Sequence, residues 1–194
     1  MATSVFDRSP ALATASILGI TAPVFASGLQ FALSHLAIPP LLNQPQSFAT
    51  PVFAHIYRAG ALVAVPLSVL GLAGSSAAAY LSHGYPVTPY DTAAKGRLMS
   101  PRTAWVSAAL LCASIPVFTG LFMKGDIDPL LERADRFATA GARGVGKQAV
   151  ATTPADDALV RGWLASWRRL NFVRSGIMGT AACFAAYAIF TAAV

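Results

Sequence analysis

The sequence is poor in charge: only 11% of its 194 residues are Asp, Glu, Lys or Arg. A soluble domain carries about 25% charged residues, so this scarcity excludes an ordinary soluble enzyme. Hydrophobic residues make up 55% of the chain, and they gather in uncharged runs of about twenty residues. A helical run of that length spans a hydrocarbon core about 30 Å thick. We therefore predict a multi-pass integral membrane protein of one domain, residues 1–194.

Cysteine is also scarce, and both residues of this type, Cys112 and Cys183, fall inside apolar runs. This usage implies no disulfide framework, because buried cysteines in such runs are usually packing material. The net charge of +6 would suggest a nucleic-acid partner in a soluble protein. Here the basic residues are scattered and form no patch with interleaved aromatic residues. We expect them to meet the anionic lipids of the bilayer, and we expect no nucleic-acid partner.

Helix signals divide the chain into four spans. Ser9-Pro10 indicates the start of the first helix, and four prolines in residues 38–51 predict a surface loop, so that the second helix starts near residues 51–55. The third helix is expected to stop at the charged turn of residues 124–129, and Thr153-Pro154 predicts the start of the fourth. The expected spans are approximately residues 11–37, 55–82, 103–123 and 171–193, with an extramembrane loop and stalk over residues 124–170.

The fourth helix is predicted to be long. From Pro154 to Val194 it would measure about 60 Å at 1.5 Å per residue, twice the thickness of the hydrocarbon core. Its first half should therefore project from the membrane. The predicted fold class is all-α: an integral membrane four-helix bundle with up-down topology and a projecting fourth helix.

Polar residues gather at one end of this bundle. In an up-down arrangement the end of the first helix, the start of the second, the end of the third and the start of the fourth share one side of the membrane. Polar groups in a membrane need partners, so we expect the groups at these ends to meet, with Arg58, Asn171 and Arg174 buried. For Trp163, Lys124, Arg168 and Arg169, anchoring at the headgroups is the alternative. The polar residues at these ends are Gln30, Ser34, His35, His55, Tyr57, Arg58, Thr119, Lys124, Asp126, Asp128, Trp163, Trp167, Asn171 and Arg174.

Four blocks of the chain resemble the anthrone oxygenases, a family of small four-helix membrane proteins of aromatic polyketide pathways. The most specific block is Trp167-Arg-Arg-Leu-Asn171-Phe-Val-Arg174, which is similar to the family's Trp, Asn, Arg signature. The turn at residues 125–128 reads Gly-Asp-Ile-Asp, where many members carry Asn. The other blocks are Ser27-Gly28 with Ser34 and Pro39-Pro40, His55-Ile-Tyr57-Arg58-Ala-Gly60 with Pro66, and Pro116-Val-Phe118-Thr119 with Met123.

The resemblance implies a membrane-bound oxygenase that converts an aromatic polyketide anthrone to an anthraquinone. Molecular oxygen would be the co-substrate, with no organic cofactor or metal, and the reaction would proceed by proton abstraction and direct reaction of the carbanion with oxygen. His35, His55, Asp126 or Asp128 could accept the proton, Arg58 and Arg174 could hold the anion, and Asn171 could orient a carbonyl or peroxide. The implied substrate-binding residues are Tyr57, Phe118, Thr119, Trp163 and Trp167.

Two other functions remain open from the sequence. Two histidines and two aspartates at one membrane face could ligate iron or copper, although no His-x-x-His or His-x-x-x-His spacing appears. A non-enzymatic scaffold or transporter is the other alternative, but the mid-span positions are small or apolar. The sequence leaves open whether copies form a homo-oligomer. If the source is eukaryotic, we expect an intracellular membrane such as the endoplasmic reticulum.

Overall fold

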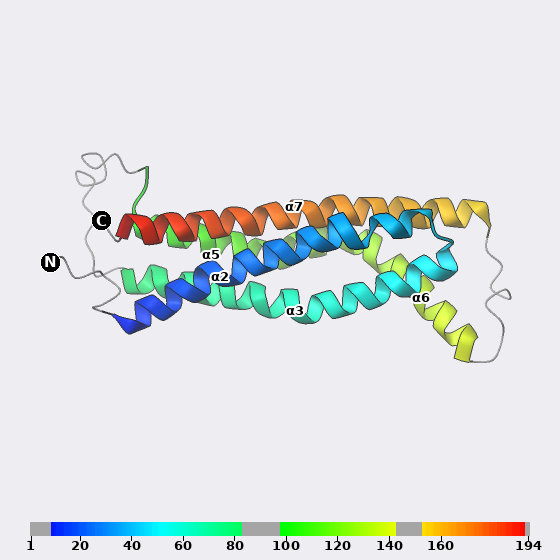
Figure 1. The fold of residues 1–194 in the computed structure, drawn as a ribbon, viewed down its shortest axis with the longest axis horizontal. Coiled ribbons are helices and arrows are strands. Elements are labelled where there is room, and N and C mark those ends of the chain that lie inside the picture. Colours follow the sequence, from blue (N-terminus) through cyan, green and yellow to red (C-terminus); the bar gives the residue numbers. More distant parts are fainter. Residues whose placement is uncertain (1–8, 83–97, 143–152, 193–194) are drawn as a thin grey trace. The chain divides into compact units, whose positions relative to one another are not determined.

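A computed structural model describes residues 9–82, 98–142 and 153–192 of the chain. Every regular element within these ranges is helical, and Figure 1 shows the elements coloured along the sequence. They are α2 (Pro10–Ala32), the π-helix η1 (Leu33–Ala37), the 3-10 helix η2 (Pro39–Asn43), α3 (Gln46–Leu81), α5 (Pro101–Phe118), the π-helix η4 (Thr119–Met123), α6 (Lys124–Ala142) and α7 (Pro154–Ala192).

Four helical stretches are long and apolar enough to cross a membrane, which confirms the predicted class of helical bundle. They are Pro10–Asn43, Gln46–Leu81, Pro101–Ala140 and Pro154–Thr191. This finding is consistent with a multi-pass membrane protein. The helix α7 has 39 residues, or about 58 Å at 1.5 Å per residue, so it is longer than the hydrocarbon core is thick.

The start of α7 lies where the sequence predicts it. The hydroxyl of Thr153 accepts a hydrogen bond from the backbone N–H of Asp156 at 3.2 Å, and the Asp156 carboxylate accepts one from the backbone N–H of Thr153 at 3.2 Å. This reciprocal pair satisfies donors that a helix N-terminus otherwise leaves open. Pro154 follows as the first helical residue, a position where its missing N–H costs nothing.

The predicted start of the second helix is wrong by about one turn or more. The structure begins α3 at Gln46, and Pro51 lies inside the helix rather than at its entrance. The backbone N–H of Gln46 donates to the carboxylate of Asp157 at 3.0 Å, so a residue 111 positions away caps this helix. A cap supplied from another helix leaves no local signal in the sequence.

The predicted end of the third helix is also wrong. The chain passes from α5 through η4 directly into α6, which runs to Ala142 instead of stopping at the charged turn. Four buried residues explain this continuation: Ile127, Leu130, Ala134 and Phe137 repeat at steps of three, four and three. They form one apolar stripe on a charged helix, and burying that stripe stabilises the helix despite Gly125 and Pro129.

The chain divides into two compact units. The first unit contains the beginning of α2 up to Ser27, residues 65–115 and the end of α7 from Gly176. The second unit is Gly28–Ala64 together with Pro116–Ser175. The second unit therefore gathers the end of α2, the start of α3, the end of α5 with α6, and the start of α7. These are the four ends that up-down alternation was predicted to bring together.

Each unit has its own apolar core. In the first unit, small residues allow helices α2 and α3 to approach closely, because a Cβ on Gly74 would lie 2.5 Å from the backbone nitrogen of Gly19. In the second unit the core contains large side chains and one of the two buried tryptophans. Its buried members are Ile38, Leu41, Ala49, Phe53, Met123, Ile127, Leu130, Val160, Leu164 and Trp167.

Candidate functional site

A buried amide joins α7 to the end of α2 within the second unit. The side chain of Asn171 donates from Nδ2 to the backbone oxygen of Gln30 at 2.9 Å and to the hydroxyl of Ser34 at 2.8 Å. The Ser34 hydroxyl in turn donates to the Gln30 backbone oxygen at 2.9 Å. Only 2% of the Asn171 surface is exposed. The expected burial of Asn171 is confirmed, and its side chain faces the end of α2 and η1.

The π-helix η1 places two neighbouring residues in different environments. Ser34 is buried, whereas the next residue, His35, is exposed. The backbone of η1 carries an i to i−5 bond, from the N–H of Ile38 to the oxygen of Leu33 at 3.2 Å, and Pro39 follows without an N–H to donate. Single π-turns of this kind are frequent at functional sites.

A cleft of about 460 Å³ opens beside η1 in the second unit, which is within the range of small-molecule sites. It is lined by Ser34, His35, Arg168, Arg169 and Phe172. Ser34 forms its floor, because this residue alone among the five is buried. The Arg168 Nε donates to the Ser34 backbone oxygen at 3.0 Å, which fixes this guanidinium at the cleft.

Aromatic rings stand at the same cleft. The Phe31 ring stacks on the imidazole of His35, with 5.3 Å between centroids, and lies 5.6 Å from the ring of Phe172. Neither Arg168 nor Arg169 has an ion-pair partner among the described residues. The cleft therefore combines a titratable imidazole, two cations and aromatic surface.

Arg174 and Trp167 lie on the same face of α7 as Asn171. A terminal nitrogen of Arg174 contacts the sulfur of Met123 at 3.8 Å, and Tyr57 interacts electrostatically with the guanidinium. Arg174 is half-buried, as the sequence led us to expect of a charge in this position. The Nε of Arg174 and the indole nitrogen of Trp167 are buried without a hydrogen-bond partner among the described residues.

Aromatic side chains of α3 pack against Trp167. The Phe53 ring meets the Trp167 ring edge-on at 5.3 Å, and Tyr57 stacks on Phe53 at 6.0 Å. Phe118, at the end of α5, is half-buried against the same core. The structure thus brings Tyr57, Phe118 and Trp167 together in the core of the second unit, but none of the three lines the cleft beside η1, and their role in substrate binding stays a prediction. Thr119, the first residue of η4, is half-buried next to Phe118 in the chain.

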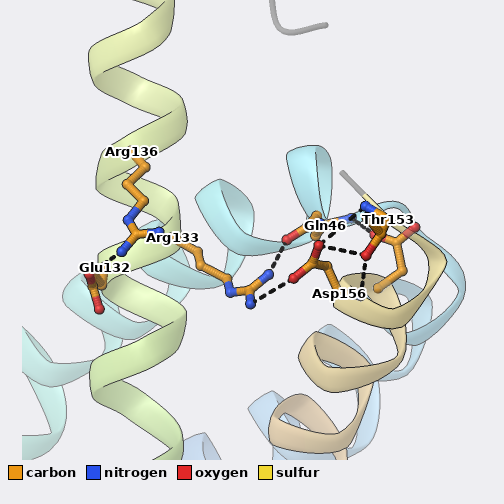
Figure 2. A network of polar contacts seen from close by, with 7 residues as sticks. Gln46, Glu132, Arg133, Arg136, Thr153 and Asp156 are labelled. Atoms are coloured by element: carbon orange, nitrogen blue, oxygen red, sulfur yellow. Dashed lines mark hydrogen bonds and ion pairs between the residues drawn. The ribbon is translucent and has the colours of Figure 1, made fainter. Parts of the chain in front are cut away.

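Trp163 lies beside a separate polar clamp formed by Arg133, Gln46 and Asp156. Figure 2 shows the contacts among these three clamp residues. The guanidinium of Arg133 donates to the side-chain oxygen of Gln46 at 2.5 Å and to the Asp156 carboxylate at 3.0 Å, and it lies 5.2 Å from the Trp163 ring. This clamp joins α6 to the first turns of α3 and α7. It also covers one face of the Trp163 ring with a cation, which is the arrangement of a cation–π contact.

The clamp also affects the charge of Asp156. This carboxylate lies in the first turn of α7, more than 20 Å along the helix from Asn171 at 1.5 Å per residue, so it is outside the predicted hydrocarbon span. Hydrogen bonds from the Thr153 hydroxyl and backbone, followed by that from Arg133, lower the pKa of Asp156 below its ordinary value of 3.8. Hydrogen bonds to a carboxylate favour its charged form.

Four predicted site residues lie away from the Asn171 bridge. The expected burial of Arg58 is wrong: its side chain is 57% exposed and forms an ion pair with Asp135 of α6 at 2.8 Å. The sequence predicts a short helix through Arg136 but places it outside the bundle, so it does not indicate that Asp135 would meet Arg58. His55 and Asp128 are exposed, and Asp126 is half-buried. Their roles as base or anion holder stay predictions.

Metal ligands do not converge among the described residues. No group of three or more His, Cys, Asp or Glu side chains there could hold a metal ion. The alternative of an iron or copper centre therefore has no ligand set in the described part of the chain.

The sequence did not indicate a catalytic or binding role for two polar residues of the site. Gln30 and Ser34 were expected only to contribute to the polar end, yet the backbone oxygen of Gln30 and the hydroxyl of Ser34 are the partners of Asn171. Their spacing of four residues places both on one helical face. That spacing is the signal from which the pairing could have been inferred.

Comparison with known proteins places the chain beside a described family. A family model described as anthrone oxygenase matches residues 53–184, which include α7 as far as Phe184 and therefore the Trp167, Asn171 and Arg174 face. No curated protein and no solved structure matches the chain.

Proposed function

Because the chain belongs to the anthrone oxygenase family, we propose that it oxidises an anthrone to an anthraquinone with molecular oxygen at the polar end of its second unit. In the overall reaction the methylene carbon of the anthrone loses two hydrogens and gains one oxygen as a carbonyl. The other oxygen atom leaves with both hydrogens as water. The observation that carries the location is the buried Asn171 bridge directly behind the cleft floor at Ser34.

The cleft suits a flat, largely apolar ligand. Phe172 lines it and Phe31 stacks on the His35 that lines it, which offers ring surface for an aromatic tricycle. In this proposal His35 is the general base. Of the four base candidates it is the one that lines the cleft, and a ring nitrogen of a neutral imidazole can accept a proton. The ring nitrogen of His35 takes one proton from the methylene carbon.

The anion that remains needs stabilisation as its charge spreads onto the carbonyl oxygen. Arg174 and Trp167 do not line the cleft, but they flank Asn171 on α7, and each holds a buried N–H without a partner among the described residues. A donor that is already desolvated and unpaired costs little to reorganise when charge develops nearby. Arg168 supplies a further positive charge at the cleft.

The electron-rich carbanion then reacts with oxygen to form a carbon-bound peroxide. The proton held by His35 passes to the outer peroxide oxygen. Loss of the remaining hydrogen from that carbon breaks the O–O bond, forms the carbonyl and releases water. During these steps the hydrogen bond from Asn171 to Ser34 holds the cleft residue Ser34 in a fixed position relative to α7.

Oxygen uptake by purified protein in detergent tests this function. With an anthrone as substrate, wild-type protein should consume oxygen well above the rate of spontaneous oxidation. Arg174→Gln and His35→Gln should each lower kcat by about 10²-fold or more, the usual contribution of such groups. Arg161→Gln is the matched control, because Arg161 is an exposed arginine of the same helix, whereas Arg174 is half-buried one turn from Asn171. Equal rates for wild type and heat-inactivated protein would contradict the proposed function.

A further inference from the structure

Gln30 carries a buried amide that nothing in the described structure satisfies. Only 2% of the residue is exposed, and neither Nε2 nor Oε1 of its side chain has a hydrogen-bond partner among the described residues. The backbone oxygen of the same residue accepts two hydrogen bonds, from Asn171 and Ser34. The backbone is thus held in place while the side chain is left unpaired.

A second buried glutamine in the same unit shows the ordinary situation. Gln46 is 3% exposed, and its side-chain oxygen accepts a hydrogen bond from Arg133 at 2.5 Å. Buried polar side chains are nearly always paired in this way, because an unpaired one loses its water without compensation. Gln30 departs from that rule, so the fold gains nothing from having an amide at this position.

The direction of the Gln30 side chain follows from its helix. Gln30 and Ser34 are buried, whereas Phe31 and His35, the residues that follow each of them, are exposed. The face of α2 that carries Gln30 therefore points into the second unit, toward the Asn171 side of α7. Arg174, three residues after Asn171, presents an unpaired Nε in the same interior.

Gln30 does not line the cleft itself but lies one turn before Ser34, on the same helical face. We propose that Gln30 is a substrate-binding residue whose amide holds the oxygen-bearing end of a ligand that reaches past Ser34. This inference rests on the proposed function and extends it to a residue that precedes the matched segment, residues 53–184. A primary amide donates through Nε2 and accepts through Oε1. It is complementary to a ligand edge that carries an acceptor beside a donor, such as a carbonyl flanked by a phenolic hydroxyl.

The pair Gln30→Met and Gln46→Met separates a ligand-binding amide from a structural one. Methionine keeps the length and apolar volume of glutamine and removes only the amide. We expect Gln30→Met to melt at the same temperature as wild type or higher, with KM for a hydroxylated anthrone raised by about tenfold, the worth of one hydrogen bond. We expect Gln46→Met to melt at a lower temperature with KM unchanged.

A pair of substrates provides the second measurement. Wild-type protein should prefer 1,8-dihydroxyanthrone over unsubstituted anthrone in kcat/KM, and Gln30→Met should reduce that preference by about tenfold. Unchanged preference and KM in active Gln30→Met protein would overturn the inference and leave the proposed function intact. Failure of Gln30→Met to fold would also overturn it, because the amide would then be structural. If wild-type protein oxidises neither compound, the proposed function itself fails.

Discussion

Asn171→Leu is the change that most directly tests the bridge between α2 and α7. Leucine fills a similar volume but removes both hydrogen bonds, to the Gln30 backbone oxygen at 2.9 Å and to the Ser34 hydroxyl at 2.8 Å. Ser34 still donates to the Gln30 oxygen after the change, so neither acceptor becomes wholly unpaired. Two net hydrogen bonds at about 1 kcal/mol each give a loss of about 2 kcal/mol in the free energy of unfolding.

That loss can be expressed as a melting temperature. For a chain of 150–250 residues, 1 kcal/mol corresponds to about 2–4 °C, so Asn171→Leu should melt about 4–8 °C below wild type. Tryptophan fluorescence of the detergent-solubilised protein is a suitable assay, because Trp167 lies one turn from the substitution. Asn43→Leu is the control, since Asn43 is an exposed asparagine of the same unit and its replacement should shift the melting temperature by about 2 °C or less. Equal melting temperatures for Asn171→Leu and wild type would refute the bridge.

Three further predictions concern charged groups of the second unit. Arg58→Ala should change the melting temperature by about 2 °C or less, because its ion pair with Asp135 is more than half exposed on both sides, and a clear drop would show that the pair is structural. Arg133→Met should lower the free energy of unfolding by about 2 kcal/mol, because the contacts of Arg133 are mostly shielded from solvent. Thermal unfolding at low and high salt measures this loss, and an effect as small as that of Arg58→Ala would contradict the clamp. The lowered pKa of Asp156 contributes stability that is present above the ordinary value of 3.8 and is lost as pH falls through the lower pKa of the folded state. The difference in melting temperature between wild type and Asp156→Asn should therefore shrink as the pH is lowered from 7 to below 4, and a difference independent of pH would count against this account.

Hydropathy and alternation were sufficient to predict the helical bundle and the set of helix ends that meet. A run of apolar residues as long as the bilayer is thick has one stable conformation, because every backbone polar group must be paired inside the segment. The start of α7 was also readable, since Thr153, Pro154 and Asp156 carry the cap within four residues. Each of these features depends on residues that are close together in the sequence.

The features that were wrong or missed depend on contacts between distant segments. The start of α3 at Gln46 is fixed by Asp157, and the exposure of Arg58 follows from a partner on α6. The sequence predicts only a short helix through Arg136 in this region, because Gly125, Pro129 and the many charges obscure the apolar stripe that continues the helix to Ala142. Gln30 looked like one more interfacial amide until its burial was known. Partners of this kind are set by tertiary packing and leave no local pattern.

Isotope labelling tests the central claim, that the polar end of the second unit inserts an atom of molecular oxygen into an anthrone. Purified protein is supplied with ¹⁸O₂ in ordinary water, and the product mass is compared with that from heat-inactivated protein, which reports spontaneous oxidation. The account predicts one ¹⁸O atom in each product molecule, formed faster by wild type than by the inactivated sample, with the excess reduced in Arg174→Gln. An unlabelled product, or a labelled product formed no faster than without active protein, would contradict it.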